Sequence, residues 1–285
     1  MASPEAQRIR AGLFRFPPAA DIAADRAGWE GWAATQPLPA DVTETTPAYG
    51  GVAGRLISPP DLEKDRLVVA FHGGGLVSGA SVTHRGLAAM LAKATARPVF
   101  VPDYRRLPET APEDVRADGI AVLAAARSAG HLTVFADSSG AALALAAMQD
   151  MARRGEALPD RVVFLSPAID ATLAGDSFEA NAEKDPTLSH VSLRHWQSVV
   201  EKVAPLDGPI LSPLFQPIGG LPPMLLLAGS DELWRDDAVR LADRVTAAGG
   251  TVRLSIYPDM WHVWPMSGDM PETAQAMAEI AAFVG

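Results

Sequence analysis

The chain has 285 residues, of which 48% are hydrophobic and 20% charged, so it can bury a full core and has the size of a single α/β domain. Its formal net charge of −10 argues against a nucleic-acid partner and against binding to anionic lipid, because both repel an acidic surface. The lack of cysteine excludes disulfides, thiolate metal sites and cysteine nucleophiles. Any nucleophile must therefore be an oxygen or an amine.

Neither the first residues nor the apolar stretches predict secretion or a membrane span. Residues 1–12 lack the basic-then-apolar run of a secretory signal, and no stretch approaches the roughly 18 uninterrupted apolar residues of a membrane helix. We expect no stable membrane insertion and a soluble, cytoplasmic protein. Histidines and carboxylates show no metal-ligand spacing such as H-E-x-x-H, so no metal site is predicted.

Short β-branched and apolar runs alternate with Ala- and Leu-rich helical patterns along most of the chain. This order is typical of crossover units, and it predicts an α/β fold with about eight mostly parallel strands and helices on both faces. Three runs are apolar on both sides, as central strands must be. The predicted strands are 42–46, 52–58, 67–72, 98–102, 132–136, 161–166, 224–229 and 252–257.

Helical patterns fill most intervals between the strands, and several end at Gly or Pro. Two segments interrupt the alternation: residues 1 to about 40, called here the N-terminal segment, and residues about 170 to 220, called the insertion. We expect one domain spanning 1–285 in which these two segments form a small helical cap over the carboxyl end of the sheet, where open α/β folds bind ligands. The predicted helices are 81–96, 112–129, 139–154, 193–203, 235–248 and 271–283.

One apolar strand runs through Asp137 into Ser138 and then directly into an Ala-rich helix. Such a turn holds the serine in a strained backbone conformation with its Oγ exposed, and the positions two before and two after it must be small. Ala136 and Gly140 meet this requirement for Ser138, whereas Ser139 would have the larger Asp137 before it. We predict Ser138 as a nucleophile; the alternative is a serine that only caps the helix.

A glycine run, Gly73 to Gly75, follows the apolar strand at 67–71. Consecutive glycines let the backbone turn its N–H groups inward, toward a reacting oxygen on which negative charge develops. We predict an oxyanion hole made by the amides of Gly74, Gly75 and Ser139, with the positive end of a helix dipole at Ser139. In isolation the run could equally be a flexible turn or a phosphate loop, but it lacks the Lys-Ser/Thr of a P-loop.

The base must be a histidine beyond the last strand, and of six histidines only His262 meets this condition. A carboxylate on its Nδ1 side is needed to fix the tautomer and stabilise the imidazolium. We expect Asp231, the first acidic residue after the strand at 224–229, to supply it, with Glu232 solvated or capping a helix. The order Ser138, Asp231, His262 is the one that this kind of fold requires.

Five segments of the chain resemble the hormone-sensitive-lipase-like bacterial (family IV) esterases, which have the α/β-hydrolase fold. The resemblance covers about residues 50–285. It implies the Ser-His-Asp set above, an acyl-enzyme mechanism, no cofactor, and homodimers through the last strand, and from it we predict a carboxylesterase for short to medium acyl esters. The segments are His72–Gly75, Asp103–Glu109, Asp137–Gly140, Asp231–Asp236 and His262–Trp264.

Departures from the family pattern leave the substrate open. Ser139 replaces the usual alanine and could hydrogen-bond near the oxyanion, and Leu76 replaces an aromatic residue. We place Leu76 and Trp264 in the substrate pocket, although a large aromatic is as often core, and we favour a structural network for Asp103–Arg105. Amide or lactone hydrolysis shares the mechanism, and a lyase or a non-catalytic ligand-binding member of the fold are further alternatives.

Overall fold

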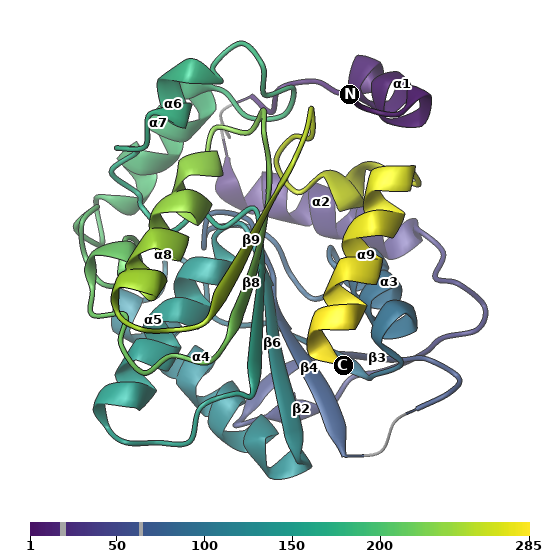
Figure 1. Cartoon of the computed structure of the whole chain (residues 1–285), viewed down its shortest axis with the longest axis vertical. Helices are drawn as coiled ribbons and strands as arrows, with labels where there is room; N and C mark the ends of the chain where they lie inside the picture. Colours follow the sequence, from purple (N-terminus) through teal and green to yellow (C-terminus); the bar gives the residue numbers. More distant parts are fainter. Residues whose placement is uncertain (18–20, 63–64) are drawn as a thin grey trace.

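The computed structural model describes residues 1–17, 21–62 and 65–285, and its centre is one twisted sheet (Figure 1). Nine strands occur in the described residues, in the order β1-β3-β5-β4-β6-β7-β8-β9, with β2 paired to β3. The strands from β4 to β9 pair in parallel, and β1, β2 and β3 pair antiparallel at one side. The strands are β1 Thr43–Thr45, β2 Ala48–Tyr49, β3 Val52–Ser58, β4 Arg66–Phe71, β5 Val99–Pro102, β6 His131–Asp137, β7 Arg161–Leu165, β8 Met224–Gly229 and β9 Val252–Tyr257.

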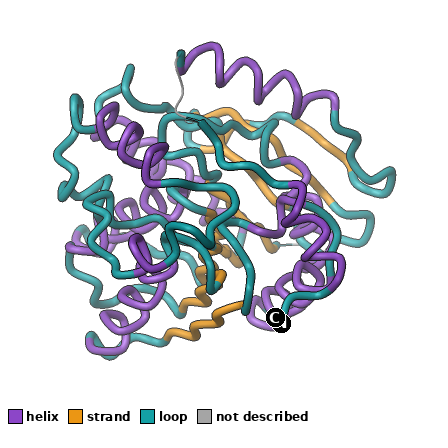
Figure 2. The backbone as a smooth tube through the Cα atoms, turned by 90° about the horizontal axis from the view of Figure 1, so that it is seen from above, coloured by secondary structure: helices purple, strands orange, loops and turns teal. Residues whose placement is uncertain are grey.

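Helices cover both faces of the sheet, and Figure 2 shows them on either side of the strands. Helices α3 (Arg85–Thr95) and α9 (Pro271–Val284) pack together on one face. Helices α4 (Pro112–Ala126), α5 (Gly140–Arg153) and α8 (Arg235–Ala247) cover the other. Proline starts α4 and α9, where its missing N–H leaves no intrahelical bond unmade.

Side chains of the central strands enter two cores, one on each face. In β4, Leu67, Val69 and Phe71 enter the core under α4 and α5, whereas Val68 and Ala70 enter the core under α3 and α9. Successive residues of a strand point to opposite faces, so a strand covered on both sides must be apolar throughout. The predicted α/β class and the mostly parallel sheet are confirmed.

The register of the sheet brings the chemically important loops to one edge. Phe71 of β4 pairs with Ala136 of β6, so the glycine run and the serine turn begin side by side. Gly229 of β8 pairs with Tyr257 of β9, so the loops that contain the predicted acid and histidine also begin at one level. This edge is the carboxyl end of the parallel strands, where ligands of such folds bind.

Three elements differ most from the sequence prediction, and one of them is α3, which begins four residues after its predicted start at 81. Strand β2 was not predicted, because two residues between Pro47 and Gly50 are too few to show an alternating pattern. Helix α7 runs over His190–Val200 and begins three residues before the predicted start. Its start is set by Ser189, whose Oγ accepts the Ser192 N–H in a reciprocal capping box.

The N-terminal segment and the insertion contain helices outside the sheet pattern. Helices α1 (Pro4–Gly12) and α2 (Ile22–Thr35) belong to the N-terminal segment, of which residues 18–20 lie outside the described residues. Helices α6 (Ser177–Ala180) and α7 belong to the insertion, and with α1 they lie at the top of Figure 1. Within the described residues, every helix is too short or too polar to cross a membrane.

Candidate active site

Ser138 lies in the sharp turn between β6 and α5. Its φ of +50° is the left-handed conformation expected of a strained serine turn. A Cβ at Gly140 would lie 2.1 Å from the Phe71 carbonyl oxygen, so glycine is required there, whereas Ala136 fits as a fully buried strand residue. The Ser138 N–H donates to the Leu165 carbonyl at 3.0 Å, which anchors the turn to β7.

His262 reaches the serine from the loop after β9. Its Nε2 lies 2.9 Å from Ser138 Oγ. The loop is held close to the sheet because a Cβ at Gly229 would meet the Met260 carbonyl oxygen at 2.3 Å, and because the Val263 N–H donates to Ser166 Oγ at 3.0 Å. The structure thus brings together the two residues predicted as nucleophile and base.

The carboxylate on the histidine is Glu232, and the expectation that Asp231 contacts His262 is wrong. Glu232 Oε2 lies 2.8 Å from His262 Nδ1, and Glu232 Oε1 accepts the Gly229 N–H at 2.6 Å. Asp231 instead forms an ion pair of 3.0 Å with Arg10 of α1.

Backbone pairing explains this one-residue offset. The N–H groups of Ser230 and Asp231 continue to bond the loop after β9, to the carbonyls of Tyr257 and Met260. These two bonds hold residues 230 and 231 in a turn against the end of β9 and its following loop. Asp231 falls on the side of α1, and Glu232 falls on the side of His262.

Charges around His262 favour its protonated form. Burial alone lowers the pKa of His262, but its hydrogen bond to Glu232 and the negative charges of Glu232, Asp185 and Asp137 together raise that pKa above its ordinary value. No local sequence pattern pointed to Asp185, which belongs to the insertion. A base with such surroundings accepts a proton readily from a hydroxyl beside it.

The glycine loop has the conformation of an anion-binding turn. Gly74 and Gly75 have φ of +119° and +69°, and a Cβ at Gly74 would lie 2.3 Å from the Ser78 carbonyl oxygen. Among the residues that the structure describes, the N–H groups of Gly74, Gly75 and Ser139 have no hydrogen-bond partner, whereas that of Gly73 donates to Asp137 Oδ2 at 3.2 Å. Three amides near the serine are thus available to a reacting oxygen.

Two side-chain contacts fasten the glycine loop. Ser139 Oγ accepts the N–H of the buried Leu76 at 3.0 Å, so the residue that replaces the family's alanine ties the serine turn to the loop. Trp196 of α7 donates its Nε1–H to the Gly75 carbonyl at 2.8 Å. Sequence analysis did not single out Trp196, because nothing local distinguishes it from a core aromatic.

The remaining predicted residues have structural roles. Trp264 is fully buried and packs against Tyr257 with ring centroids 4.8 Å apart, so its placement in the substrate pocket is wrong and it is a core residue. Asp103 accepts the N–H and the hydroxyl of Ser81, and Tyr104 donates its hydroxyl to the His72 carbonyl at 2.6 Å. These two residues form the network behind the glycine loop that we favoured.

Metal ligands are not grouped in this site. Across 1–17, 21–62 and 65–285, no three His, Cys, Asp or Glu residues gather in a way that could hold a metal ion.

A strained serine turn, a histidine and a buried carboxylate on a mostly parallel sheet define the serine hydrolases of the α/β-hydrolase type. Residues 68–266 match the family model described as alpha/beta hydrolase fold, and the chain belongs to this family. A solved esterase from the bacterial hormone-sensitive lipase (HSL) family superposes with a TM-score of 0.91 at 32% identity, covering 100% of this chain and 98% of the other. A hormone-sensitive lipase from a metagenome library gives 0.90 at 29% identity, covering 98% and 96%.

Sequence relatives agree with these structures. An esterase of Acinetobacter venetianus is 33% identical over 228 residues, which are 76% of this chain and 74% of the relative. An acetyl-hydrolase of Streptomyces hygroscopicus is 32% identical over 230 residues, which are 79% and 77%. The predicted resemblance to the hormone-sensitive-lipase-like esterases is confirmed, and the chain is a carboxylesterase.

Proposed function

We propose that this carboxylesterase hydrolyses short to medium acyl esters through an acyl-enzyme on Ser138. The observation that carries the proposal is the continuous line from Ser138 Oγ to His262 Nε2, at 2.9 Å, and from His262 Nδ1 to Glu232, at 2.8 Å. Neither distance needs a rearrangement for proton transfer, because both fall within hydrogen-bond reach.

The first half of the reaction forms the acyl-enzyme. Ser138 Oγ bonds to the ester carbonyl carbon while its proton passes to His262 Nε2, and the carbonyl oxygen becomes an oxyanion held by the amides of Gly74, Gly75 and Ser139. The carbon–oxygen bond to the alcohol then breaks, and the alcohol leaves with the proton from His262. Glu232 stays ionised and stabilises the imidazolium.

The second half releases the acid. Water gives its proton to His262 Nε2 as its oxygen bonds to the acyl carbon, and the same amides hold the second oxyanion. The bond to Ser138 Oγ breaks, Oγ recovers the proton, and the carboxylic acid leaves. No cofactor takes part in any step of this scheme.

One contact of the glycine loop supports the proposed size of the acyl group. Trp196 lies beside Gly75, where an added Cβ would meet its ring nitrogen at 2.5 Å, and the ring edge of Trp196 rests on Trp234. The ring of Trp196 beside the proposed oxyanion site supports a preference for short acyl chains. The acetyl-hydrolase among the relatives agrees with this preference.

Stopped-flow hydrolysis of p-nitrophenyl esters from acetate to dodecanoate tests the proposal. We expect a burst of p-nitrophenol, turnover that falls with chain length, and loss of turnover by several orders of magnitude in Ser138→Ala and His262→Ala. The same assay on p-nitroanilides and lactones decides between ester, amide and lactone bonds. Full turnover in Ser138→Ala would show the nucleophile to be wrong, and ligand binding without turnover would favour a lyase or a receptor.

Three further parts of the prediction remain proposals. We propose that the N-terminal segment and the insertion act as a cap, supported by the Phe16 N–H bond to the Thr187 carbonyl that joins them at 2.9 Å.

A homodimer through β9 is supported by the position of β9 at the edge of the sheet, with Ile256 exposed. Sedimentation velocity tests the dimer, and a monomer at micromolar concentration would contradict it. A cytoplasmic location stays a prediction.

A further inference from the structure

Asp185, in the insertion, is a fully buried carboxylate that accepts hydrogen bonds on both oxygens. Its Oδ1 accepts the N–H and the hydroxyl of Thr187 and the N–H of Leu188, each at 2.9 Å. Its Oδ2 accepts the N–H of Leu233 at 3.1 Å. Four donors around one buried carboxyl group are the surroundings of an ionised carboxylate, because the neutral acid would place its own proton against a donor.

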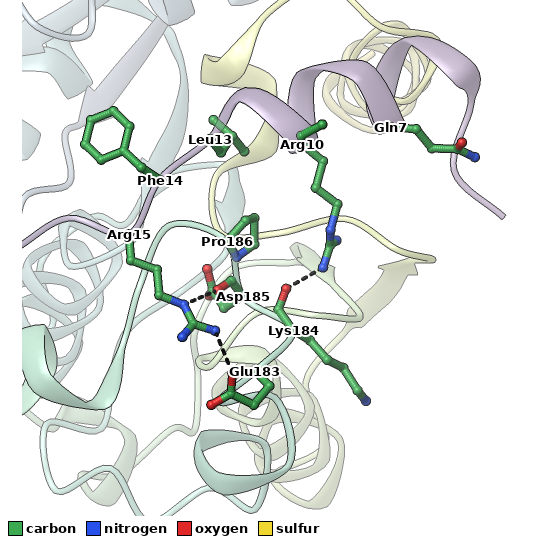
Figure 3. A pocket seen from close by; sticks show the side chains of 10 residues that line it. Gln7, Arg10, Leu13, Phe14, Arg15, Glu183, Lys184, Asp185 and Pro186 are labelled. Carbon is green, nitrogen blue, oxygen red and sulfur yellow. Dashed lines mark hydrogen bonds and ion pairs between the residues drawn. The ribbon is translucent and has the colours of Figure 1, made fainter.

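The charge of Asp185 is not neutralised by a contact. Within the described part of the chain, no Lys, Arg or His nitrogen lies within 4 Å of its carboxylate. Figure 3 shows the neighbouring cations: Arg15 bonds the Asp185 backbone carbonyl at 3.1 Å and pairs with Glu183, and the Lys184 side chain points away. Arg10 bonds the Lys184 carbonyl and pairs with Asp231. The negative charge of Asp185 is therefore available to act on other buried groups.

The pocket of Figure 3 is lined both by this turn and by the N-terminal segment, which also bond each other directly through Arg10 and Arg15. Its volume is about 530 Å³, and the N-terminal segment lies across it from residues 183–186. None of its lining residues belongs to the serine, histidine and glutamate set. The Asp185 carboxylate instead bonds Leu233, on the side of the catalytic acid.

The insertion also holds the backbone of the catalytic acid. Asn181 is fully buried, and its Nδ2 donates to the carbonyls of Ser230 at 2.9 Å and Glu232 at 3.0 Å. Asp185 accepts a hydrogen bond from the N–H of Leu233, the residue after Glu232. Asn181 and Asp185, four positions apart, thus hold the backbone on both sides of Glu232.

The negative charges of three carboxylates, from three elements, act on His262. Glu232 comes from the loop after β8 and bonds Nδ1, Asp137 comes from the end of β6, and Asp185 comes from the insertion. Asp137 Oδ2 lies 3.4 Å from His84 Nε2 and accepts the Gly73 N–H at 3.2 Å. Burial, which lowers the pKa of His262, is opposed first by Glu232 and then by Asp185, which raises that pKa.

We propose that Asp185 and Asn181 are positioning residues for catalysis: Asn181 and Asp185 fix the backbone that carries Glu232, and Asp185 adds a second buried negative charge that stabilises the His262 imidazolium. The inference rests on the proposed acyl-enzyme mechanism, because only a reaction that protonates His262 benefits from this charge. It also gives the insertion a part in the chemistry besides covering the site.

Two variants separate the effect of backbone positioning around Glu232 from the effect of the Asp185 charge. Asp185→Asn keeps the shape but removes the charge, and we expect kcat to fall about tenfold, KM to change by less than about threefold, and the acid limb of kcat/KM to move down by about half a pH unit or more. Asn181→Ala removes two hydrogen bonds and no charge, and we expect kcat to fall while the pH midpoint stays within about 0.2 of wild type. Thr187→Val, which removes one donor to Asp185, is the control and keeps the wild-type midpoint.

The outcomes distinguish this inference from the proposed function. Full turnover in Ser138→Ala would overturn the acyl-enzyme scheme. A wild-type burst together with a wild-type pH midpoint in Asp185→Asn would overturn only the role of Asp185, even if its melting temperature fell. If Asp185→Asn does not fold, Asn181→Ala decides: wild-type kcat in that variant would refute the positioning role.

Discussion

Glu232 Oε2 lies 2.8 Å from His262 Nδ1, while the neighbouring Asp231 pairs with Arg10 at 3.0 Å. Two adjacent carboxylates thus have different tasks, one orienting the base and one fastening helix α1. We expect Glu232→Gln to lower kcat by about 100- to 10,000-fold, because the uncharged amide neither stabilises the imidazolium nor favours the required tautomer.

Asp231→Asn is the matched control for Glu232→Gln. It keeps shape and loses the partly buried ion pair with Arg10, so we expect kcat within about threefold of wild type and a small loss of stability. Steady-state kinetics and thermal unfolding of both variants check the assignment. A large loss of kcat in Asp231→Asn with little loss in Glu232→Gln would reverse it.

The raised pKa of His262 predicts the pH dependence of activity. Only the neutral imidazole accepts the Ser138 proton, so kcat/KM must rise with pH as His262 loses its proton, with a midpoint above the ordinary 6.5. The same shift has the opposite sign for stability. The contribution of His262 to stability is full below the unfolded pKa and is lost as pH rises through the folded pKa.

Measurements on p-nitrophenyl butyrate from pH 5 to 9, with Ser138→Ala melting curves over the same range, check both signs. An acid limb with its midpoint below 6 would contradict the raised pKa. Because Ser138→Ala cannot form an acyl-enzyme, its melting curves report the titration of His262 without acylation of the protein.

Ser139 Oγ accepts the Leu76 N–H, and removal of the Ser139 hydroxyl tests this hydrogen bond. In Ser139→Ala the buried N–H loses its acceptor, and we expect the free energy of unfolding to fall by about 1–3 kcal/mol and kcat to fall several-fold. Urea unfolding and ester hydrolysis measure the two effects. Ser128→Ala, which removes an exposed hydroxyl that bonds the Ala125 carbonyl, is the control and should change neither.

Trp196 connects α7 to the glycine loop, and two substitutions separate its bond from its bulk. Trp196→Phe keeps a ring but loses the 2.8 Å bond to the Gly75 carbonyl, so we expect kcat to fall several-fold for every ester. Trp196→Ala also opens space beside the loop, so we expect the preferred acyl chain to lengthen. The exposed Trp32, replaced by Phe, should leave the chain-length profile unchanged. An unchanged profile in Trp196→Ala would place the acyl chain elsewhere.

Local patterns in the sequence were sufficient for much of the fold. The bounds predicted for β3, β8 and β9 match the structure, because turn residues flank all three; β8 is a fully buried apolar run, whereas β3 and β9 mix buried and exposed residues. The turn at Ser138 and the glycines at 74 and 75 are equally local, since their backbone conformations require small residues at fixed spacing. His262 was found from chain order alone.

Tertiary structure decided the rest, because it depends on which segments meet. Asp231 and Glu232 are both acidic and adjacent, and only the pairing of the β8 and β9 loops determines which one faces His262. Trp264 is a core residue because α3 and α9 close over it, and Asp185 reaches the catalytic acid from 47 positions earlier in the chain. The sequence by itself determined the class of fold, the serine turn through local sterics and the proposed histidine through chain order, whereas long-range packing determined which carboxylate contacts that histidine and what supports it.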